Sequence, residues 1–205
     1  MTQPLAQQKQ VIRKQMRQLR RSLTEQMQRQ AAQNLLLQLQ QQPFFQQAQC
    51  LAVYLAQDGE LSMEPLIHYG WKINKQMFLP VCRPFNQAQL WFSKFHPNTR
   101  LKANKFTIPE PESPLNSLIK VSLLDIVFFP LVAFDLNGAR LGMGGGFYDS
   151  TFAHLREQKQ RPLFIGVAHN DQCHQQLPNE EWDLPLDAVA TPNQLHCFNS
   201  ERIFG

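Results

Sequence analysis

Apolar residues recur at helical spacing near the start of the chain, at Ile12, Met16, Leu19 and Leu23. This pattern predicts a helix over residues 7–21. Ser22 and Glu25 have the spacing of a capping box, so a second helix is expected to start there and run to about residue 41. Pro43 should end this helical segment.

Beyond residue 43 the pattern changes to short apolar runs separated by turns and short helices. The runs expected to form strands are residues 50–55, 76–79, 90–95, 125–129, 163–168 and 187–190. Pro80 and Pro130 should end the strands before them. Helices are expected over residues 64–71 and 147–155, and residues 96–117 should form an irregular surface loop. Strands that alternate with helices predict an α/β fold of three layers, α/β/α, with a mostly parallel sheet covered on both faces.

Length and charge limit the possible organisation and partners. A chain of 205 residues fits a single α/β domain that spans residues 1–205. A basic helical segment at its N-terminus, about residues 7–42, is expected to pack against the body of this domain. Residues 1–29 hold seven Lys/Arg and one Glu, a balance of +6, so the total of +4 leaves −2 for the rest. This distribution does not indicate a general nucleic-acid surface, although binding of nucleic acid through the N-terminal helix is a weaker rival hypothesis.

The chain shows no sign of export or of membrane insertion. It has no apolar run of about 18 residues, and its charged start lacks the apolar core of a secretory signal. An Arg-rich, acid-poor start could resemble a transit peptide, but a role in the first helix explains it better. The cysteines at 50, 82, 173 and 197 form no Cys-x-x-Cys pair. Cys173-His174 and His196-Cys197 could imitate half of a metal site, but buried free thiols in a reducing cytoplasm are expected.

The main candidate for chemistry is the glycine-rich stretch at Gly142, Gly144, Gly145 and Gly146, between a predicted strand and a predicted helix. Such a turn offers bare backbone N–H groups to an anion, and the helix start adds partial positive charge. It lacks the Gly-Lys-Ser/Thr of a Walker loop, and Phe147 stands where a dinucleotide motif needs its third glycine. A plain flexible turn remains the alternative.

Charged residues near this stretch strengthen the phosphate hypothesis. Arg140 is placed to hold a phosphate, and Asp149 is placed to hold a metal beside it. The first helix carries a stripe of like charges at Lys9, Arg13, Arg17 and Arg20. Like charges four residues apart cost a helix roughly 0.2–0.5 kcal/mol each. The stripe is therefore either a solvated face or a surface along which an anion lies.

A second candidate is the turn Gln57-Asp58-Gly59-Glu60, which follows the predicted strand 50–55. Open α/β sheets place ligand residues at the carboxyl ends of their strands. Glu60 is therefore a candidate binding residue, and a solvated turn residue is the alternative. The histidines have no visible partners in the sequence and receive no role.

Together these motifs resemble the 5-formyltetrahydrofolate cyclo-ligase family, also called methenyltetrahydrofolate synthetases, across nearly the full length. The matching motifs are Lys9-x-x-x-Arg13, Glu60, Ile108-Pro109-Glu110-Pro111, Gln172, Asp187 and the signature Phe134-Asp135-x-x-Gly138-x-Arg140-Leu141-Gly142-x-Gly144-x-Gly146-Phe147-Tyr148-Asp149. The resemblance implies the α/β/α fold shared with glucosamine-phosphate deaminases, ribose-phosphate isomerases and CoA transferases. It also implies an enzyme that uses ATP and Mg2+ to close 5-formyltetrahydrofolate into 5,10-methenyltetrahydrofolate, releasing ADP and phosphate.

The resemblance also assigns residues to roles. ATP should contact Lys9, Arg13, Arg140, Leu141, Gly142, Met143, Gly144, Gly145, Gly146, Phe147 and Tyr148. The folate should contact Glu60, Met143, Gly144, Gly145, Gly146 and Phe147. Arg140 and Tyr148 are the expected catalytic residues, and Asp149 and Asp187 the expected magnesium ligands, although Asp187 could simply be a surface acid. We expect a monomer that acts on folate with or without a polyglutamate tail; a non-catalytic folate- or nucleotide-binding protein is the alternative.

Three departures from the family pattern stand out. Some relatives carry Lys in the glycine run, where this chain has Gly145. The signature often ends Tyr-Tyr-Asp, whereas Phe147 here lacks the first hydroxyl. Many bacterial relatives have Glu-Pro-His-Asp where this chain has Glu180-Glu181-Trp182-Asp183.

The implied reaction explains why such residues are needed. The formyl group is an amide, so its carbonyl is a poor electrophile, and its oxygen leaves badly. Phosphorylation of that oxygen solves both problems, because phosphate departs easily when the 10-nitrogen attacks. The protein then mainly positions the substrates and neutralises charge. Glu60 would suit the donor-rich edge of a pterin, since a carboxylate accepts paired N–H bonds.

Overall fold

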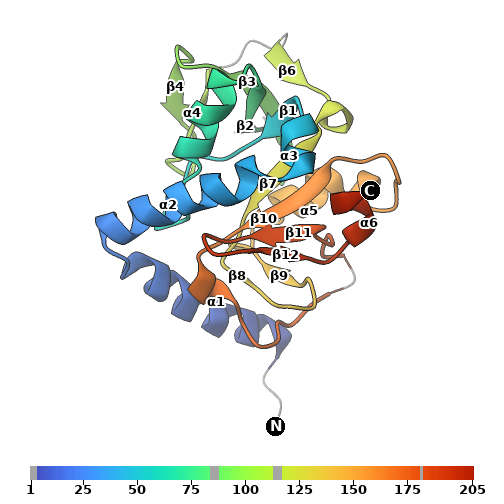
Figure 1. Cartoon of the computed structure of the whole chain (residues 1–205). Coiled ribbons are helices and arrows are strands. Elements are labelled where there is room, and N and C mark those ends of the chain that lie inside the picture. Colours follow the sequence, from blue (N-terminus) through green and yellow to red (C-terminus); the bar gives the residue numbers. More distant parts are fainter. Residues whose placement is uncertain (1–3, 84–87, 113–116, 181) are drawn as a thin grey trace.

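Consecutive residues of the central strands are buried on opposite faces of one large sheet. The computed structural model, which describes residues 4–83, 88–112, 117–180 and 182–205, arranges this sheet in the order β12-β11-β10-β7-β1-β2-β3-β6 (Figure 1). Its strands are β1 (Cys50–Ala52), β2 (Gln76–Cys82), β3 (Leu90–Phe95), β6 (Leu118–Ile119), β7 (Ile126–Pro130), β10 (Leu163–Val167), β11 (Ala188–Ala190) and β12 (Leu195–Cys197). The five strands from β11 to β2 are parallel, and the outer strands are antiparallel. The predicted α/β fold with a mostly parallel sheet is confirmed.

Helices cover both faces of this sheet. Ile126 and Phe128 face α2 (Glu25–Gln40), α3 (Pro43–Gln47), α4 (Glu64–Lys72) and α6 (Ser200–Phe204). Val127 and Phe129 face the other side, which is covered by the short helix α5 (Phe147–Phe152), the 3-10 turn η3 (Ala153–Leu155) and residues 184–186. The near-continuous apolar character of β7 follows from burial on both faces.

Helix α1 (Leu5–Arg21) lies at the end of the molecule next to β8 (Ala133–Phe134) and β9 (Arg140–Leu141) (Figure 1). Its Ile12 packs in a small cluster with Leu141 and Leu177. Two charged residues, Lys9 and Arg20, are buried on the same side of the helix. The helix therefore docks through a mixture of apolar packing and buried charge. None of the described helices is long and apolar enough to span a membrane.

Two of the predicted boundaries were wrong for local reasons. The second helix is capped by Thr24, whose Oγ1 accepts from the Met27 N–H at 3.2 Å, whereas the Ser22 hydroxyl donates to the Leu19 carbonyl at the end of α1. Pro43 does not simply end the helical segment, because it occupies the first turn of α3.

The prediction that Pro80 ends its strand was also wrong, since β2 continues to Cys82. β1 pairs with β2 only as far as Phe78, so the missing N–H of Pro80 falls beyond that ladder. The expected loop at 96–117 contains the short antiparallel pair β4 (Leu101–Ala103) and β5 (Pro109–Pro111), and its residues 113–116 lie outside the described part. Single 3-10 turns, η2 (Val121–Leu123) and η4 (Asn170–Gln172), complete the chain.

The C-terminal helix is tied to the sheet by a buried carboxylate. Asp187 Oδ2 accepts from Arg161 Nη1 at 2.7 Å and from the Phe164 N–H at 2.8 Å. Its Oδ1 lies 3.0 Å from Arg161 Nη2 and 3.1 Å from Nε of Arg202 on α6. Since Asp187 is fully buried, each of these charges depends on the others for its neutralisation.

We therefore expect Asp187→Asn to lower the free energy of unfolding by about 3–5 kcal/mol, because two arginines would lose their counter-charge in the interior. Denaturant titration followed by circular dichroism measures this. Glu25→Gln provides the control, since Glu25 pairs with Arg29 on the exposed face of α2 and should matter little. Equal midpoints for the two variants would contradict the interpretation.

Candidate active site

Helix α1 brings the glycine stretch and the Glu60 turn to one region of the molecule. Near its middle, Arg13 Nε donates to the Gly142 carbonyl at 2.8 Å. At its end, Arg20 Nε donates to the Asp58 carbonyl at 2.7 Å, and Arg20 Nη2 lies 3.8 Å from a Glu60 carboxylate oxygen. Two candidate segments that are about 80 residues apart in the chain therefore meet on one helix.

The glycine stretch is an exposed bend that only small residues could form. Gly144 has φ +94° and Gly146 has φ +64°, both in the left-handed region. A Cβ at Gly144 would lie 3.4 Å from the Arg13 guanidinium carbon, so the bend packs closely against α1. A Cβ at Gly145 would lie 2.8 Å from the Phe147 ring, so a lysine there would require that ring to move.

Arg140 is engaged by protein groups next to the bend. Its guanidinium donates to Asp149 Oδ1 and to the Leu184 carbonyl, and it lies 5.2 Å above the Phe129 ring. The Leu184 N–H in turn donates to Asp149 Oδ1 at 3.1 Å. Arg140 thus links β9 to α5 and to the backbone at Leu184, and Asp149 is its counter-charge.

Lys9 is paired with acidic residues from the other end of the chain. The buried ammonium donates to Glu180, and Asp183 Oδ2 lies 3.5 Å away. The nearby Asp183 also acts on Arg13, whose pKa is lowered by burial while Asp183 partly opposes that shift. Of the residues that depart from the family pattern, Trp182 is exposed, and Glu181 lies outside the described residues.

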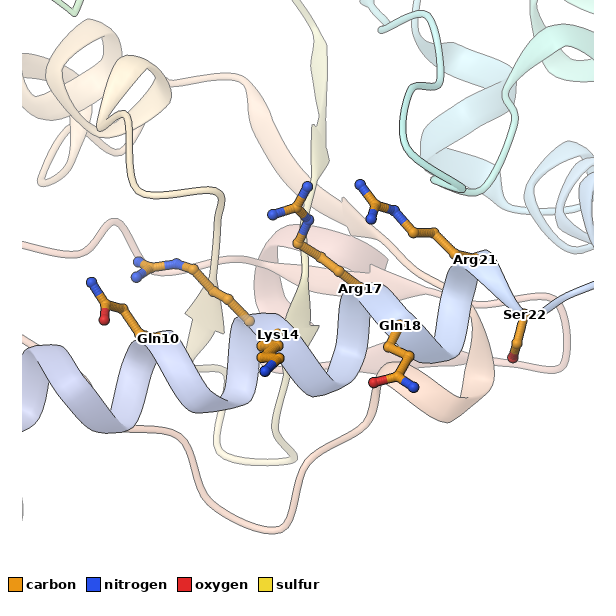
Figure 2. Close-up of a pocket in the computed structure, with 7 residues that line it drawn as sticks. Gln10, Lys14, Arg17, Gln18, Arg21 and Ser22 are labelled. Carbon is orange, nitrogen blue, oxygen red and sulfur yellow. The ribbon is translucent and has the colours of Figure 1, made fainter.

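A groove of about 640 Å³ follows the outer face of α1. It is lined by Gln10, Arg13, Lys14, Arg17, Gln18, Arg21 and Ser22. Figure 2 shows Arg17 and Arg21 pointing to the same side of the helix, where both bind Asp58. The predicted stripe of four cations is therefore divided, since Arg13 and Arg17 line the groove while Lys9 and Arg20 are buried.

The turn at residues 57–60 is held by arginines. Asp58 has φ 53° and Gly59 has φ 76°, so two successive residues are left-handed. Burial alone would raise the pKa of Asp58, but hydrogen bonds from Arg17, Arg20 and Arg21 outweigh it and lower the pKa to about 2. Asp58 is therefore ionised throughout the physiological range.

Glu60 is the only carboxylate of this turn that is not saturated by arginines. Its Oε2 accepts from the Gln57 N–H at 3.0 Å, and its side chain is 13% exposed. Burial raises its pKa, while the Gln57 hydrogen bond and Arg20 lower it and Asp58 raises it again. Glu60 can therefore offer a partly desolvated carboxylate to a ligand.

Tyr148 is half-buried beside this carboxylate. Its ring lies 4.9 Å from that of Phe129, and burial followed by the negative charge of Glu60 raises its pKa well above the ordinary value. The phenol consequently stays protonated at neutral pH. It can donate a hydrogen bond but cannot serve as a base.

The structure adds two residues that the sequence did not single out. The buried ring of His169 lies 3.2 Å from the Gly59 carbonyl, and burial lowers its pKa, so it is neutral at pH 7. Phe106 is 48% exposed and meets the Phe147 ring edge-on at 5.6 Å. Its position just before Ile108-Pro109 was the available signal. Gln172 instead donates its side-chain amide to the Leu131 and Val132 carbonyls, in the segment that follows β7.

The prediction that Asp187 binds magnesium does not agree with its surroundings. Both of its oxygens are taken by Arg161, Arg202 and a backbone N–H, so two positive charges already neutralise it. The Asp183 carboxylate accepts from the Glu180 N–H at 3.0 Å and lies 3.5 Å from Lys9, while the next residue, Leu184, donates its N–H to Asp149. No group of three or more His, Cys, Asp or Glu that could hold a metal exists among the described residues. Magnesium needs only one or two protein carboxylates where phosphate and water supply its other ligands.

Comparisons with known proteins identify the family of this chain. The model of the 5-formyltetrahydrofolate cyclo-ligase family matches residues 5–192. The chain is 42% identical over 179 residues to the 5-formyltetrahydrofolate cyclo-ligase of Escherichia coli K12, covering 87% of this chain and 97% of that protein. It is also 42% identical over 183 residues to the Haemophilus influenzae enzyme of that name, covering 88% and 95%.

Solved structures agree with this match. The 5,10-methenyltetrahydrofolate synthetase of Aquifex aeolicus superposes with a TM-score of 0.77 at 29% identity, covering 93% of this chain and 92% of that one. The Mycoplasma pneumoniae 5,10-methenyltetrahydrofolate synthetase shares the fold with a TM-score of 0.69 at 21% identity, covering 90% and 98%. The chain belongs to the 5-formyltetrahydrofolate cyclo-ligase family.

Proposed function

We propose that this protein is an enzyme that cyclises 5-formyltetrahydrofolate to 5,10-methenyltetrahydrofolate at the expense of ATP. The observation that carries the proposal is the position of α1, whose Arg13 contacts the glycine bend and whose Arg20 contacts the Glu60 turn. A nucleotide held at the bend and a folate held at Glu60 would therefore meet. We further expect a cytoplasmic monomer that accepts folate with or without a polyglutamate tail.

On the nucleotide side, residues 140–148 supply backbone N–H groups, and α1 supplies cations. Arg13 uses Nε for the Gly142 carbonyl, which leaves the two terminal nitrogens of its guanidinium for phosphate oxygens. Lys9 lies close by but is paired with Glu180, so it binds phosphate only when it exchanges partners. Arg13 is accordingly the main phosphate ligand on α1.

On the folate side, Glu60 accepts hydrogen bonds from the pterin, and aromatic rings form a wall. Phe106 and Phe147 meet edge-on and leave part of the Phe106 ring exposed for contact with an aromatic ligand. Met143 is half exposed at the bend, with its sulfur 4.0 Å from Arg20. This wall joins the bend to the Glu60 turn.

The chemistry then needs alignment and neutralisation of charge. The formyl oxygen attacks the terminal phosphorus of ATP and displaces ADP. The 10-nitrogen then attacks the activated formyl carbon, loses its proton to solvent and expels phosphate. Tyr148 can donate a hydrogen bond to a developing negative charge, and Arg13 can offset the charge of the phosphates. Arg140 orients Asp149 in this scheme, because its donors already bind Asp149 and Leu184.

Asp149 and Asp183 are the residues that would hold a magnesium ion. When bound there, the ion would neutralise phosphate oxygens and fix the orientation of the triphosphate. The Asp149 side chain is 29% exposed and the Asp183 side chain 19% exposed, so both can exchange a protein partner for a cation.

Purified protein incubated with 5-formyltetrahydrofolate and magnesium ATP should generate the methenyl absorbance together with one ADP per product. Omission of ATP should abolish the signal. If calorimetry shows that the folate binds while no ADP is released, the protein is instead a non-catalytic folate-binding member of the family.

Arg13→Gln should raise the KM for ATP about 10- to 100-fold, because a charged hydrogen bond to phosphate is lost. The KM for the folate should change much less. Lys14→Gln is the matched control. This substitution removes the same charge from the next position of α1, whose side chain does not contact the bend. Initial rates over both substrate concentrations measure these constants. Equal effects of the two variants would remove Arg13 from the nucleotide site.

Asp149→Asn and Asp183→Asn should each raise the Mg2+ concentration for half-maximal rate about tenfold or more, since each removes an anionic ligand. Asp187→Asn should leave this concentration unchanged, although it lowers stability. Magnesium titrations at saturating ATP, well below the unfolding temperature, distinguish the three. A raised requirement in Asp187→Asn with none in Asp183→Asn would reverse our assignment.

A further inference from the structure

Arg20 is fully buried at the end of α1, between the two halves of the site. Its Nε donates to the Asp58 carbonyl at 2.7 Å, and its Nη2 donates to Asp58 Oδ2 at 2.8 Å. Its Nη1 lies 3.4 Å from the Leu131 carbonyl, just beyond the end of β7. A single guanidinium thus connects α1, the 57–60 turn and the central sheet.

These contacts fix a turn whose backbone is left-handed at two successive residues. Aspartate and asparagine adopt this conformation more readily than most residues with a side chain, although less readily than glycine. A Cβ at Gly59 would lie 2.9 Å from the Arg20 carbonyl, so the turn sits directly on the end of α1. Gln28 of α2 donates to both the Arg20 and the Gly59 carbonyls, at 3.1 and 3.3 Å. The turn therefore lies against both the side chain and the backbone carbonyl of Arg20 at the end of α1.

The turn presents Glu60, and Arg20 also governs the charge around that carboxylate. The ionisable groups that act on Glu60 are Arg20, which lowers its pKa, and Asp58, which raises it; Glu60 in turn raises the pKa of its neighbours Tyr54 and Tyr148. His169 faces the turn at the Gly59 carbonyl but is neutral. Arg20 is the cation that lies within 4.0 Å of Glu60 among the described residues.

We propose that Arg20 is a positioning residue for the folate: through Asp58 it fixes the 57–60 turn, and through its charge it keeps Glu60 ionised and directed at the pterin. The inference rests on the proposed function, in which Glu60 binds the folate. It assigns to the end of α1 a role in folate affinity that is separate from the nucleotide contacts of Arg13.

The fork of a guanidinium suits this task, because it reaches the carbonyl and the carboxylate of Asp58 with two parallel donors. A lysine would keep the charge near Glu60 but lose the fork. Geometry and charge can therefore be separated by substitution.

The test compares Arg20→Gln, Arg20→Lys and Asp58→Asn with the wild type, using Arg29→Gln on the exposed face of α2 as the matched control. The Kd for 5-formyltetrahydrofolate is measured by calorimetry across pH, with kcat/KM for both substrates. Arg20→Gln should weaken folate binding about tenfold or more, because a charged hydrogen-bonding group is lost, while the KM for ATP stays within about threefold.

The pH profile separates a charge effect from a structural one. Folate binding requires ionised Glu60, so affinity is lost as the pH falls through the pKa of that group. Removing the positive charge in Arg20→Gln raises the Glu60 pKa, so the acid limb moves to higher pH. Removing the negative neighbour in Asp58→Asn lowers the pKa, so the limb moves to lower pH. Arg20→Lys should restore the wild-type limb with intermediate affinity.

An unmoved limb in both Arg20→Gln and Asp58→Asn would overturn the proposal, as would equal losses for folate and ATP. Should Arg20→Gln not fold, as judged by circular dichroism, Asp58→Asn decides by the same criteria, because asparagine tolerates the left-handed turn. Failure of the proposed function is distinguishable: the wild type would then bind the folate without turning it over, and the Kd profiles would still decide the role of Arg20.

Discussion

A buried guanidinium next to a carboxylate determines how this structure is assembled. Arg20 is removed from water at the end of α1, and such a charge is tolerated only when it is paired and hydrogen-bonded. Asp58 supplies the pair, and the carbonyls of Asp58 and Leu131 supply further acceptors. Because these partners belong to the 57–60 turn and to the residue after β7, they hold the C-terminal end of α1 in place. The packing of Ile12 and the pairing of Lys9 with Glu180 hold the other half of the helix, from which Arg13 reaches the glycine bend.

The same principle extends across the site, where buried cations are matched to carboxylates. Lys9 pairs with Glu180 and Arg20 with Asp58 from distant segments, and Arg140 pairs with Asp149 at the other end of the glycine stretch. The pairs differ in how easily they can exchange. Asp58 holds three arginines with a pKa lowered to about 2, whereas the Glu180 side chain is 27% exposed. A triphosphate can therefore compete for Lys9 without disturbing the turn that carries Glu60.

The sequence was sufficient for what depends on local pattern and insufficient for what depends on distant partners. Apolar runs predicted the central strands, and the run of glycines predicted the bend, in which Gly144 and Gly146 have positive φ. Pro80 was misjudged because the effect of a missing N–H depends on where the neighbouring strand ends. The partners of Asp187 could not be predicted, because its two arginines come from other segments and no spacing in the chain reveals that they converge. Phe106 gained its importance only through contact with Phe147.

Two of the departures from the family pattern have a common physical basis. At Gly145 a side chain would collide with the Phe147 ring, and that ring makes an edge-on contact with Phe106. The absence of a lysine at position 145 thus permits the Phe147 ring to pack against Phe106. This contact between two rings does not require a hydroxyl on residue 147. Without that lysine, the cations near the bend are Arg140, which is paired with Asp149, and Arg13 of α1, which lies against Gly144. The bend of this chain therefore depends on the docking of α1 more than a bend with its own lysine would.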